Sequence, residues 1–208
     1  MDQWRKVYRE KLGRQLAAAQ KPFVLSQDDR LRAASTGRAL DDILPPMIED
    51  TAHWPAGTVR IVWHGPEEPE LPLTGAHGLC FFQGKVLVCD ISGRGLTIPG
   101  GHIDEGEKAP ECLTREASEE ACVGLANLRL LGFIEADHRA SSDFNGRYPL
   151  RSVQAMYRAD VAEVRDFDSR HESTDRRFVT IGELPKVHHE WNAVLQKALD
   201  VAVDMDST

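Results

Sequence analysis

Apolar residues recur every three or four positions in four stretches of the chain, and this spacing predicts amphipathic helices. The stretches cover residues 2–19, about 27–44, 108–122 and 188–203. Proline cannot continue a helix, so Pro45 and Pro46 are expected to end the second one. The first two helices lie near the N-terminus, where we expect a helical extension over residues 1–57.

Shorter apolar runs bounded by Gly, Pro and charged residues predict β-strands. The expected strands are 59–63, 78–82, 85–90, 96–98, 128–134, 152–161 and 177–181. Gln83-Gly84 separates two of these runs and is typical of a hairpin turn. The remaining stretches rich in Pro, Gly or polar residues are expected to be loops, at 51–58, 65–75 and 135–151. Strands interleaved with helices favour one layered α/β or α+β domain over residues 58–208.

The composition is that of a globular protein. Hydrophobic residues make up 41% of the 208 positions and charged residues 28%, which excludes a disordered or fibrous chain. Acidic residues outnumber basic ones by 33 to 25, giving a net charge of −8. A nucleic acid is not an expected partner, because binding its backbone requires clustered Lys and Arg. A phosphate ligand would need a metal ion or a local basic patch.

The sequence also argues against a membrane or a secreted location. Charged residues interrupt the first twenty positions, which excludes the apolar core of a signal peptide there. Apolar stretches are far shorter than the ~18 residues that cross a bilayer. The four cysteines show no metal-site spacing and are expected to be reduced, mostly buried side chains: Cys80, Cys89, Cys112 and Cys122. We therefore expect a soluble cytoplasmic protein.

Three glutamates in the helix expected at 108–122 carry the clearest chemical signal. Glu116, Glu119 and Glu120 stand at positions i, i+3 and i+4, so they share one face of the helix. Like charges at this spacing repel, and Arg115 offsets only part of the repulsion. A hard divalent cation would stabilise the cluster, and oxygen ligands favour Mg²⁺ or Mn²⁺. An isolated cluster of this kind is more often a solvated helix face.

The residues around this cluster extend the pattern. The run Gly101-x5-Glu107-x7-Arg115-Glu116-x2-Glu119-Glu120 resembles the signature of the Nudix (MutT-like) hydrolase family. Six specified residues match by chance in a chain of this length with a probability on the order of 10⁻⁵. The resemblance implies an α/β/α sandwich around a mixed β-sheet and hydrolysis of a diphosphate bond in a nucleoside diphosphate joined to another group.

The resemblance also implies roles for particular residues. Glu116, Glu119 and Glu120 match the family's metal-binding carboxylates, and Gly100 matches the residue that offers its carbonyl oxygen to the metal. Glu107 and Arg115 match a pair that braces the loop against the helix. A hydrolytic water needs a proton acceptor, and Glu119, Glu120 and Glu172 are all eligible.

Two positions need separate comment. The family has glycine where this chain has Cys122, so we expect the helix to run slightly longer and to end through Gly124. Glu172 lies shortly before Phe178, a placement similar to the loop glutamate of MutT-like members, where it would bind a second metal or assist water deprotonation. An ordinary surface glutamate is an equally good interpretation of Glu172.

Weaker signals concern the substrate. The polar stretch 135–151 is long enough to be functional, and a mobile surface loop is the alternative. Its candidates for contacting a base or a distal phosphate are His138, Arg139, Arg147, Tyr148 and Arg151. Asn192 is a further candidate for reading a purine edge, and His188-His189 are expected at the start of the last helix.

These observations predict a Mg²⁺-dependent hydrolase that cleaves a diphosphate bond in a nucleoside di- or triphosphate-type substrate, including oxidised nucleoside triphosphates. The alternatives are an ADP-ribose or dinucleoside polyphosphate hydrolase and a non-catalytic module that binds nucleotides. The expected partner is a small nucleotide. The N-terminal helices are expected to cap the domain or to form a homodimer interface.

Overall fold

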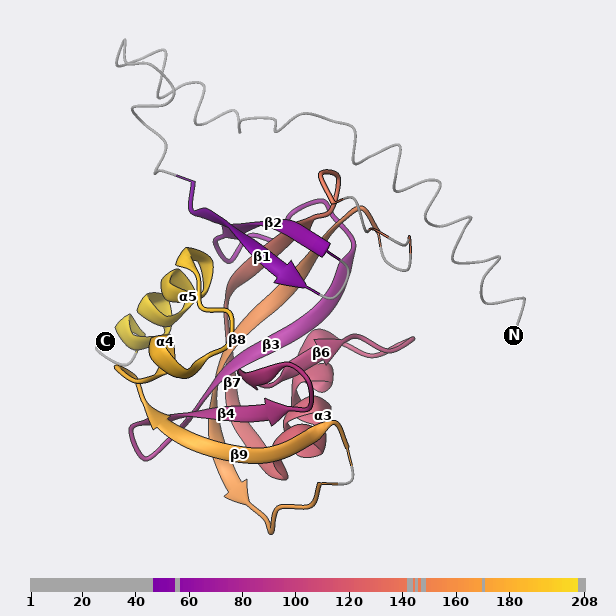
Figure 1. Cartoon of the computed structure of the whole chain (residues 1–208). Coiled ribbons are helices and arrows are strands. Elements are labelled where there is room, and N and C mark those ends of the chain that lie inside the picture. Colours follow the sequence, from indigo (N-terminus) through magenta and orange to yellow (C-terminus); the bar gives the residue numbers. More distant parts are fainter. Residues whose placement is uncertain are drawn as a thin grey trace, which may run out of the picture. The chain divides into compact units, whose positions relative to one another are not determined.

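The computed structural model describes residues 47–54, 57–141, 144, 146, 149–169 and 171–205 (Figure 1). The helices expected at 2–19 and 27–44 lie outside this part of the chain. Contacts between residues group Glu49–Thr208 into one compact unit. The functional residues predicted from the signature all belong to it.

One mixed sheet of nine strands organises the described residues. Its main path runs in the order β1 (Glu49–Trp54), β2 (Gly57–His64), β7 (Val123–Asp137), β8 (Arg151–Val164), β3 (Leu73–Phe82), β4 (Lys85–Ile91) and β5 (Gly95–Thr97). Two further strands lie off this path: β6 (Gly100–His102) pairs with β3, and β9 (Ser173–Thr180) pairs with β4. Only β3 and β8 run parallel among the described pairs; the others are antiparallel.

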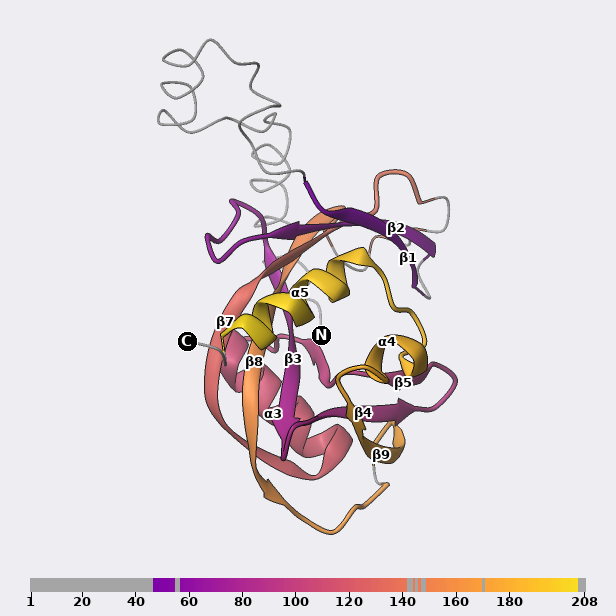
Figure 2. The same cartoon turned by 90° about the vertical axis from the view of Figure 1, so that its left-hand side faces the viewer.

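Helices cover both faces of this sheet. The helices of the described part are α3 (Ala109–Ala121), α4 (Leu184–Val187) and α5 (Ala193–Asp204). Two views at right angles place α3 on one side of the long strands β7, β8 and β3, and α5 on the other (Figures 1 and 2). The expected α/β/α sandwich around a mixed sheet is therefore confirmed.

The face of α3 that lies on the sheet is apolar, which explains why the helix docks there. Cys112, Leu113 and Ala117 are fully buried and pack against strand residues such as Ala76 and Cys80. Burying such side chains stabilises the fold by about 1.5–3 kcal/mol for each large aliphatic group. Glu116 and Glu120 border this apolar face, and their carboxylates lie against Gly101 and Gly100 of β6.

Most expected elements are confirmed, with boundaries that shift by a few residues. The hairpin between β3 and β4 turns through Gln83 and Gly84, which both take positive φ, as a two-residue hairpin loop requires. The expected loop at 51–58 is wrong, because residues 49–54 form the edge strand β1. Its apolar pattern is weak, since Ala52 alone is buried on that strand and pairing with β2 supplies the order.

Two other boundaries differ. The loop expected at 135–151 is shorter, because β7 continues through Glu135 to Asp137 with both carboxylates buried. The C-terminal helix begins at Ala193 and not at residue 188, because Asn192 caps it. The division of the chain after residue 57 stays a prediction.

No helix in the described residues is both long and apolar enough to cross a membrane. All four cysteines are free thiols, three of them buried and Cys122 half-buried.

Candidate active site

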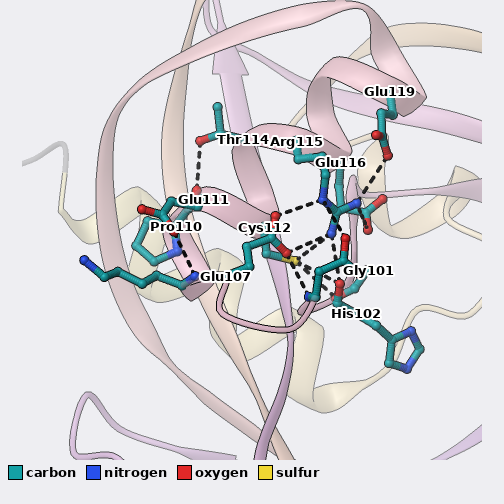
Figure 3. Close-up of polar contacts among 12 residues, drawn as sticks. Gly101, His102, Glu107, Pro110, Glu111, Cys112, Thr114, Arg115, Glu116 and Glu119 are labelled. Carbon is teal, nitrogen blue, oxygen red and sulfur yellow. Dashed lines mark hydrogen bonds and ion pairs between the residues drawn. The ribbon is translucent and has the colours of Figure 1, made fainter. Parts of the chain in front are cut away.

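The acidic signature folds as a strand, a turn and a helix (Figure 3). The carboxylate of Glu111 accepts a hydrogen bond from the Lys108 backbone N–H at 2.9 Å, which holds the chain at the start of α3. Pro110 fits the first helical turn because no N–H donor is needed there. The helix therefore begins at Ala109 and presents Arg115 and the three glutamates on its later turns.

Gly100 and Gly101 bring the backbone close to its neighbours. Gly100 has a φ of 151°, and a Cβ there would lie 2.5 Å from the Ala76 carbonyl oxygen and overlap the ring of His77. A Cβ at Gly101 would overlap the carboxylate of Glu116. Glycine at both positions allows β6 to pass between β3 and this carboxylate.

Arg115 organises the acidic face. Its Nε and Nη2 donate to the two carboxylate oxygens of Glu107 at 2.8 and 3.0 Å, and Nη2 also donates to the His102 carbonyl at 3.0 Å. Its Nη1 donates to Glu116 at 2.9 Å and to Glu119 at 3.2 Å. The bracing contact expected between Glu107 and Arg115 is present, and the guanidinium holds the pKa of Glu107 below its usual range.

Glu120 is the buried member of the cluster. Its carboxylate accepts a hydrogen bond from the Gly100 backbone N–H at 3.1 Å, and the residue is only 8% exposed. Burial raises the pKa of Glu120 to about 8, and the negative charges of Glu116 and Glu172 add to the shift. The Gly100 bond and the charge of Arg94 act in the opposite direction.

Burial also raises the pKa of Glu116, although the neighbouring Arg115 opposes the change. The surroundings of Glu116 and of Glu120 therefore both disfavour the ionised carboxylate. A bound cation would remove this penalty, because it favours the ionised form.

The helix ends earlier than the sequence predicted. Cys122 takes the left-handed conformation with a φ of 51°, and its N–H bonds back to the carbonyls of Ala117 and Ser118. Gly124 already belongs to β7. Cys122 thus fills the αL position for which helices usually select glycine, and the expectation that the helix would end through Gly124 is wrong.

Glu172 reaches the same neighbourhood from another part of the chain. It directly precedes β9, and its carbonyl accepts a hydrogen bond from the Ser92 N–H at 3.0 Å. Its charge raises the pKa of Glu120, so the two carboxylates interact electrostatically. Arg94, an exposed residue between β4 and β5, also acts on Glu120. Arg94 was not among the residues that the sequence predicted for the site. The available signal was a basic residue shortly before Gly100-Gly101.

The polar residues around β7 and β8 mostly bind one another. Arg139 pairs with Asp137 at 2.6 Å and Arg151 with Glu135 at 2.6 Å, both buried carboxylates. His138 is buried between the rings of Trp54 and Phe144. Arg147 and Tyr148 lie outside the described residues.

The C-terminal candidates have structural roles. The Asn192 side chain accepts hydrogen bonds from Val194 N and Leu195 N, at 3.1 and 3.0 Å, and so caps α5. His188 was expected at the start of that helix, but it directly follows α4 instead. Burial lowers the pKa of His188 to about 3. The geometry therefore supports a helix-capping role for Asn192.

The donor set suits a hard cation, but the side chains do not converge on one point. Within the described ranges, no group of three His, Cys, Asp or Glu side chains is arranged as a metal cluster. Arg115 binds Glu116 and Glu119, whereas Glu120 turns to the Gly100 N–H. All three glutamates nevertheless offer carboxylate oxygens from one helix, which is the ligand chemistry of Mg²⁺ and Mn²⁺. The residues therefore fit such an ion by their chemistry, and to converge on it the glutamates would have to turn from Arg115 and from the Gly100 N–H.

Comparison with known proteins decides the family. Residues 72–199, more than half of the chain, match the NUDIX domain. The chain belongs to the Nudix family. The match includes α3 and all of the predicted site residues, so the protein is a Nudix hydrolase.

Solved structures share the Nudix fold. A mutant of the Bacillus subtilis pyrophosphohydrolase BsRppH is similar with a TM-score of 0.60 and 19% identity, over 76% of this chain and 98% of that one. A UDP-X diphosphatase gives 0.51 and 14%, over 96% and 81%. The NUDIX domain of Shewanella oneidensis NrtR, complexed with ADP ribose, gives 0.50 and 16%, over 67% and 93%. A search of curated proteins found no match.

Proposed function

We propose that this Nudix hydrolase uses Mg²⁺ or Mn²⁺ to cleave a diphosphate bond in a nucleoside di- or triphosphate-type substrate. The observation that carries the proposal is the Glu116, Glu119 and Glu120 face of α3, with Glu120 buried against the backbone of Gly100. The composition supports a metal, since a protein of net charge −8 needs a cation to bring a diphosphate to an acidic face.

Glu116, Glu119 and Glu120 would hold the ion, together with the Gly100 carbonyl and, for a second ion, Glu172. The metal would polarise the diphosphate and make water a better nucleophile. Arg115 and Glu107 orient the carboxylates, because their hydrogen bonds hold the turn before α3 against the helix. A carboxylate among Glu119, Glu120 and Glu172 then accepts the proton of the attacking water.

Arg115→Lys tests the bracing role. Lysine offers one ammonium group in place of a fork, so it cannot bind Glu107 at two points and also reach Glu116 and Glu119. We expect kcat/KM to fall by about 10–100-fold, as is typical when residues that orient metal ligands are changed. Steady-state hydrolysis at saturating Mg²⁺ measures the effect. A lysine variant with wild-type kcat/KM would remove Arg115 from the mechanism.

Glu172→Gln tests the loop carboxylate. The substitution keeps the size of the side chain but removes its charge and its capacity to accept a proton. We expect kcat to fall by about 10²-fold or more if Glu172 takes part in water deprotonation. Turnover equal to the wild type across pH 6–9 would reduce Glu172 to a surface residue.

The substrate class is tested with a panel of compounds. Nucleoside triphosphates, including oxidised ones, are the first choice because the short segment from Phe82 to Ile98 is like that of MutT-type enzymes. ADP-ribose and dinucleoside polyphosphates are the alternatives within the same chemistry. Phosphate or pyrophosphate release with Mg²⁺ and with Mn²⁺ ranks these substrates. Binding of a nucleotide with no hydrolysis of any of them would indicate a non-catalytic module instead.

We further propose that the protein acts in the cytoplasm on a small nucleotide, and that the N-terminal helices expected at 2–19 and 27–44 cap the domain or join two copies. The four free thiols are in keeping with a reducing compartment. Light scattering of the full chain and of a chain starting at residue 47 tests the dimer, because only the full chain would then have twice its monomer mass.

A further inference from the structure

The C-terminal end of α3 is held by arginines from another part of the chain. The helix has no basic residue in its own last turn, so the negative end of its dipole lacks a local cation. Arg165 donates to the Val123 carbonyl at 2.9 Å and to the Ser118 hydroxyl at 3.0 Å. Arg176 donates to the carbonyls of Ala121 and Cys122. The helix end that follows Glu120 is therefore fixed from outside.

The same groups also hold the segment that leads to Glu172. Arg176 Nη2 donates to the Arg165 carbonyl, and the Arg165 N–H donates to the Cys122 carbonyl at 3.0 Å. The thiol of Cys122 accepts a hydrogen bond from the Asp168 N–H at 3.3 Å. We name these contacts among Cys122, Arg165, Asp168 and Arg176 the Arg176 clasp. They connect the end of α3 to residues 165–168 directly through Cys122 and indirectly through Arg176.

The clasp joins the end of α3, which follows Glu120, to β9, which Glu172 directly precedes. Arg176 is in β9, opposite Cys89 of β4, and Glu172 directly precedes the same strand. Glu120 is the residue before Ala121, whose carbonyl Arg176 binds. Glu120 and Glu172 belong to different elements, and like charges on them repel. A contact that joins these elements opposes this repulsion, in addition to the pairing of β9 with β4.

We propose that Arg176 and Cys122 are positioning residues, which hold Glu172 at a fixed place relative to Glu120 through the clasp. This inference rests on the proposed function, since it assigns the two residues to the water-activating part of that site. Cys122 has a double role: it supplies the αL conformation that ends α3, and its thiol holds Asp168. The glycine of the family signature would supply the first and lack the second.

Two substitutions separate positioning from simple stability. Arg176→Lys keeps the positive charge at the helix end but cannot bind α3 and the Arg165 carbonyl together. Cys122→Gly removes the thiol contact while favouring the αL backbone, so it is not expected to destabilise the helix end. Arg177→Lys is the matched control, because Arg177 is an exposed neighbour that pairs with Asp175 outside the clasp.

We expect kcat to fall about tenfold in Arg176→Lys and in Cys122→Gly with KM unchanged, because small misplacements of catalytic groups are costly. Arg177→Lys should keep the wild-type kcat. In a Glu172→Gln background, neither substitution should reduce kcat further, since the group they position has already lost its function. Amide hydrogen exchange of residues 165–169 should become faster in both variants and not in the control.

Three results would overturn the proposal. They are wild-type kcat in both variants, an equal loss in the Glu172→Gln background, and unchanged hydrogen exchange over residues 165–169. Failure of the proposed function has a different outcome, in which the wild type hydrolyses no member of the substrate panel. The hydrogen-exchange comparison still tests the clasp in that case.

Discussion

Glu120→Gln is expected to abolish hydrolysis and, at the same time, to make the metal-free protein more stable. Glutamine can still accept the hydrogen bond from Gly100, but it carries no charge that burial penalises. The loss of a metal-binding carboxylate should lower kcat by about 10²–10⁴-fold. Assays at saturating Mg²⁺ and thermal unfolding with a chelator measure the two effects on the same preparation.

The pH dependence of this effect follows from the raised pKa of Glu120, about 8. A carboxyl whose pKa is raised by folding costs no stability below the pKa that it has in the unfolded chain. The cost grows as the pH rises from that pKa to the pKa in the folded protein, and it stays constant above. The wild type without metal should therefore lose stability between about pH 4.5 and pH 8. The glutamine variant should lose less, because among the described residues only Glu116 then keeps a carboxyl whose pKa burial raises. At pH 8.5 we expect a difference of at most about 5 kcal/mol, the value for the full shift from 4.5 to about 8, or at most roughly 10–20 °C in Tm.

Glu119→Gln is the matched control for the stability arm. The Glu119 side chain is 38% exposed and has one bond to Arg115, so its replacement should reduce activity with little change in Tm. Full activity in both glutamine variants would contradict the proposed mechanism. Equal Tm values for the wild type and Glu120→Gln at pH 8.5 would show that burial of the ionised Glu120 carboxylate does not destabilise the metal-free protein.

Gly100→Ala should be among the most damaging single substitutions in the protein. Its backbone takes a φ of 151°, and the added methyl group would overlap His77 and lie 2.5 Å from the Ala76 carbonyl. We expect a loss of at least about 3 kcal/mol in the free energy of unfolding, because both backbone strain and a steric clash must be accommodated. Chemical denaturation measures this loss.

Gly106→Ala separates the two contributions. Gly106 has a φ of 83°, but a Cβ there would meet no atom within 4 Å. This control should cost only about 1–2 kcal/mol, from backbone strain alone. If both variants lost the same free energy, the tight passage of β6 beside β3 would not be the cause.

Local patterns predicted the helix that carries the site with good accuracy. The expected range 108–122 became Ala109–Ala121, since apolar spacing and a proline in the first turn are both found within a few positions. The three glutamates and the pairing of Glu107 with Arg115 followed from the same short segment. A chemical signature that fits into one strand, turn and helix can be interpreted before the fold is known.

Features that depend on contacts between distant residues were not predicted. The edge strand β1 has little apolar alternation, and pairing with β2 makes it a strand. Glu135 and Asp137 were placed in a loop, because the pairing with β2 and β8 that extends β7 through them involves distant residues. Arg176 has no signal in its own neighbourhood, since its partners lie more than fifty positions earlier, at the end of α3.

The pairing of β4 with β9 has a consequence for how the enzyme matures. These strands join residues 85–91 to residues 173–180, so the intervening chain must be synthesised before the pairing can form. Closing so long a loop costs entropy and slows folding, whereas the β6 turn and α3 depend on close neighbours. A nascent chain would therefore acquire its acidic helix first and Glu172 last. The residues of the proposed active site therefore come together only after the final third of the chain has been synthesised and has docked.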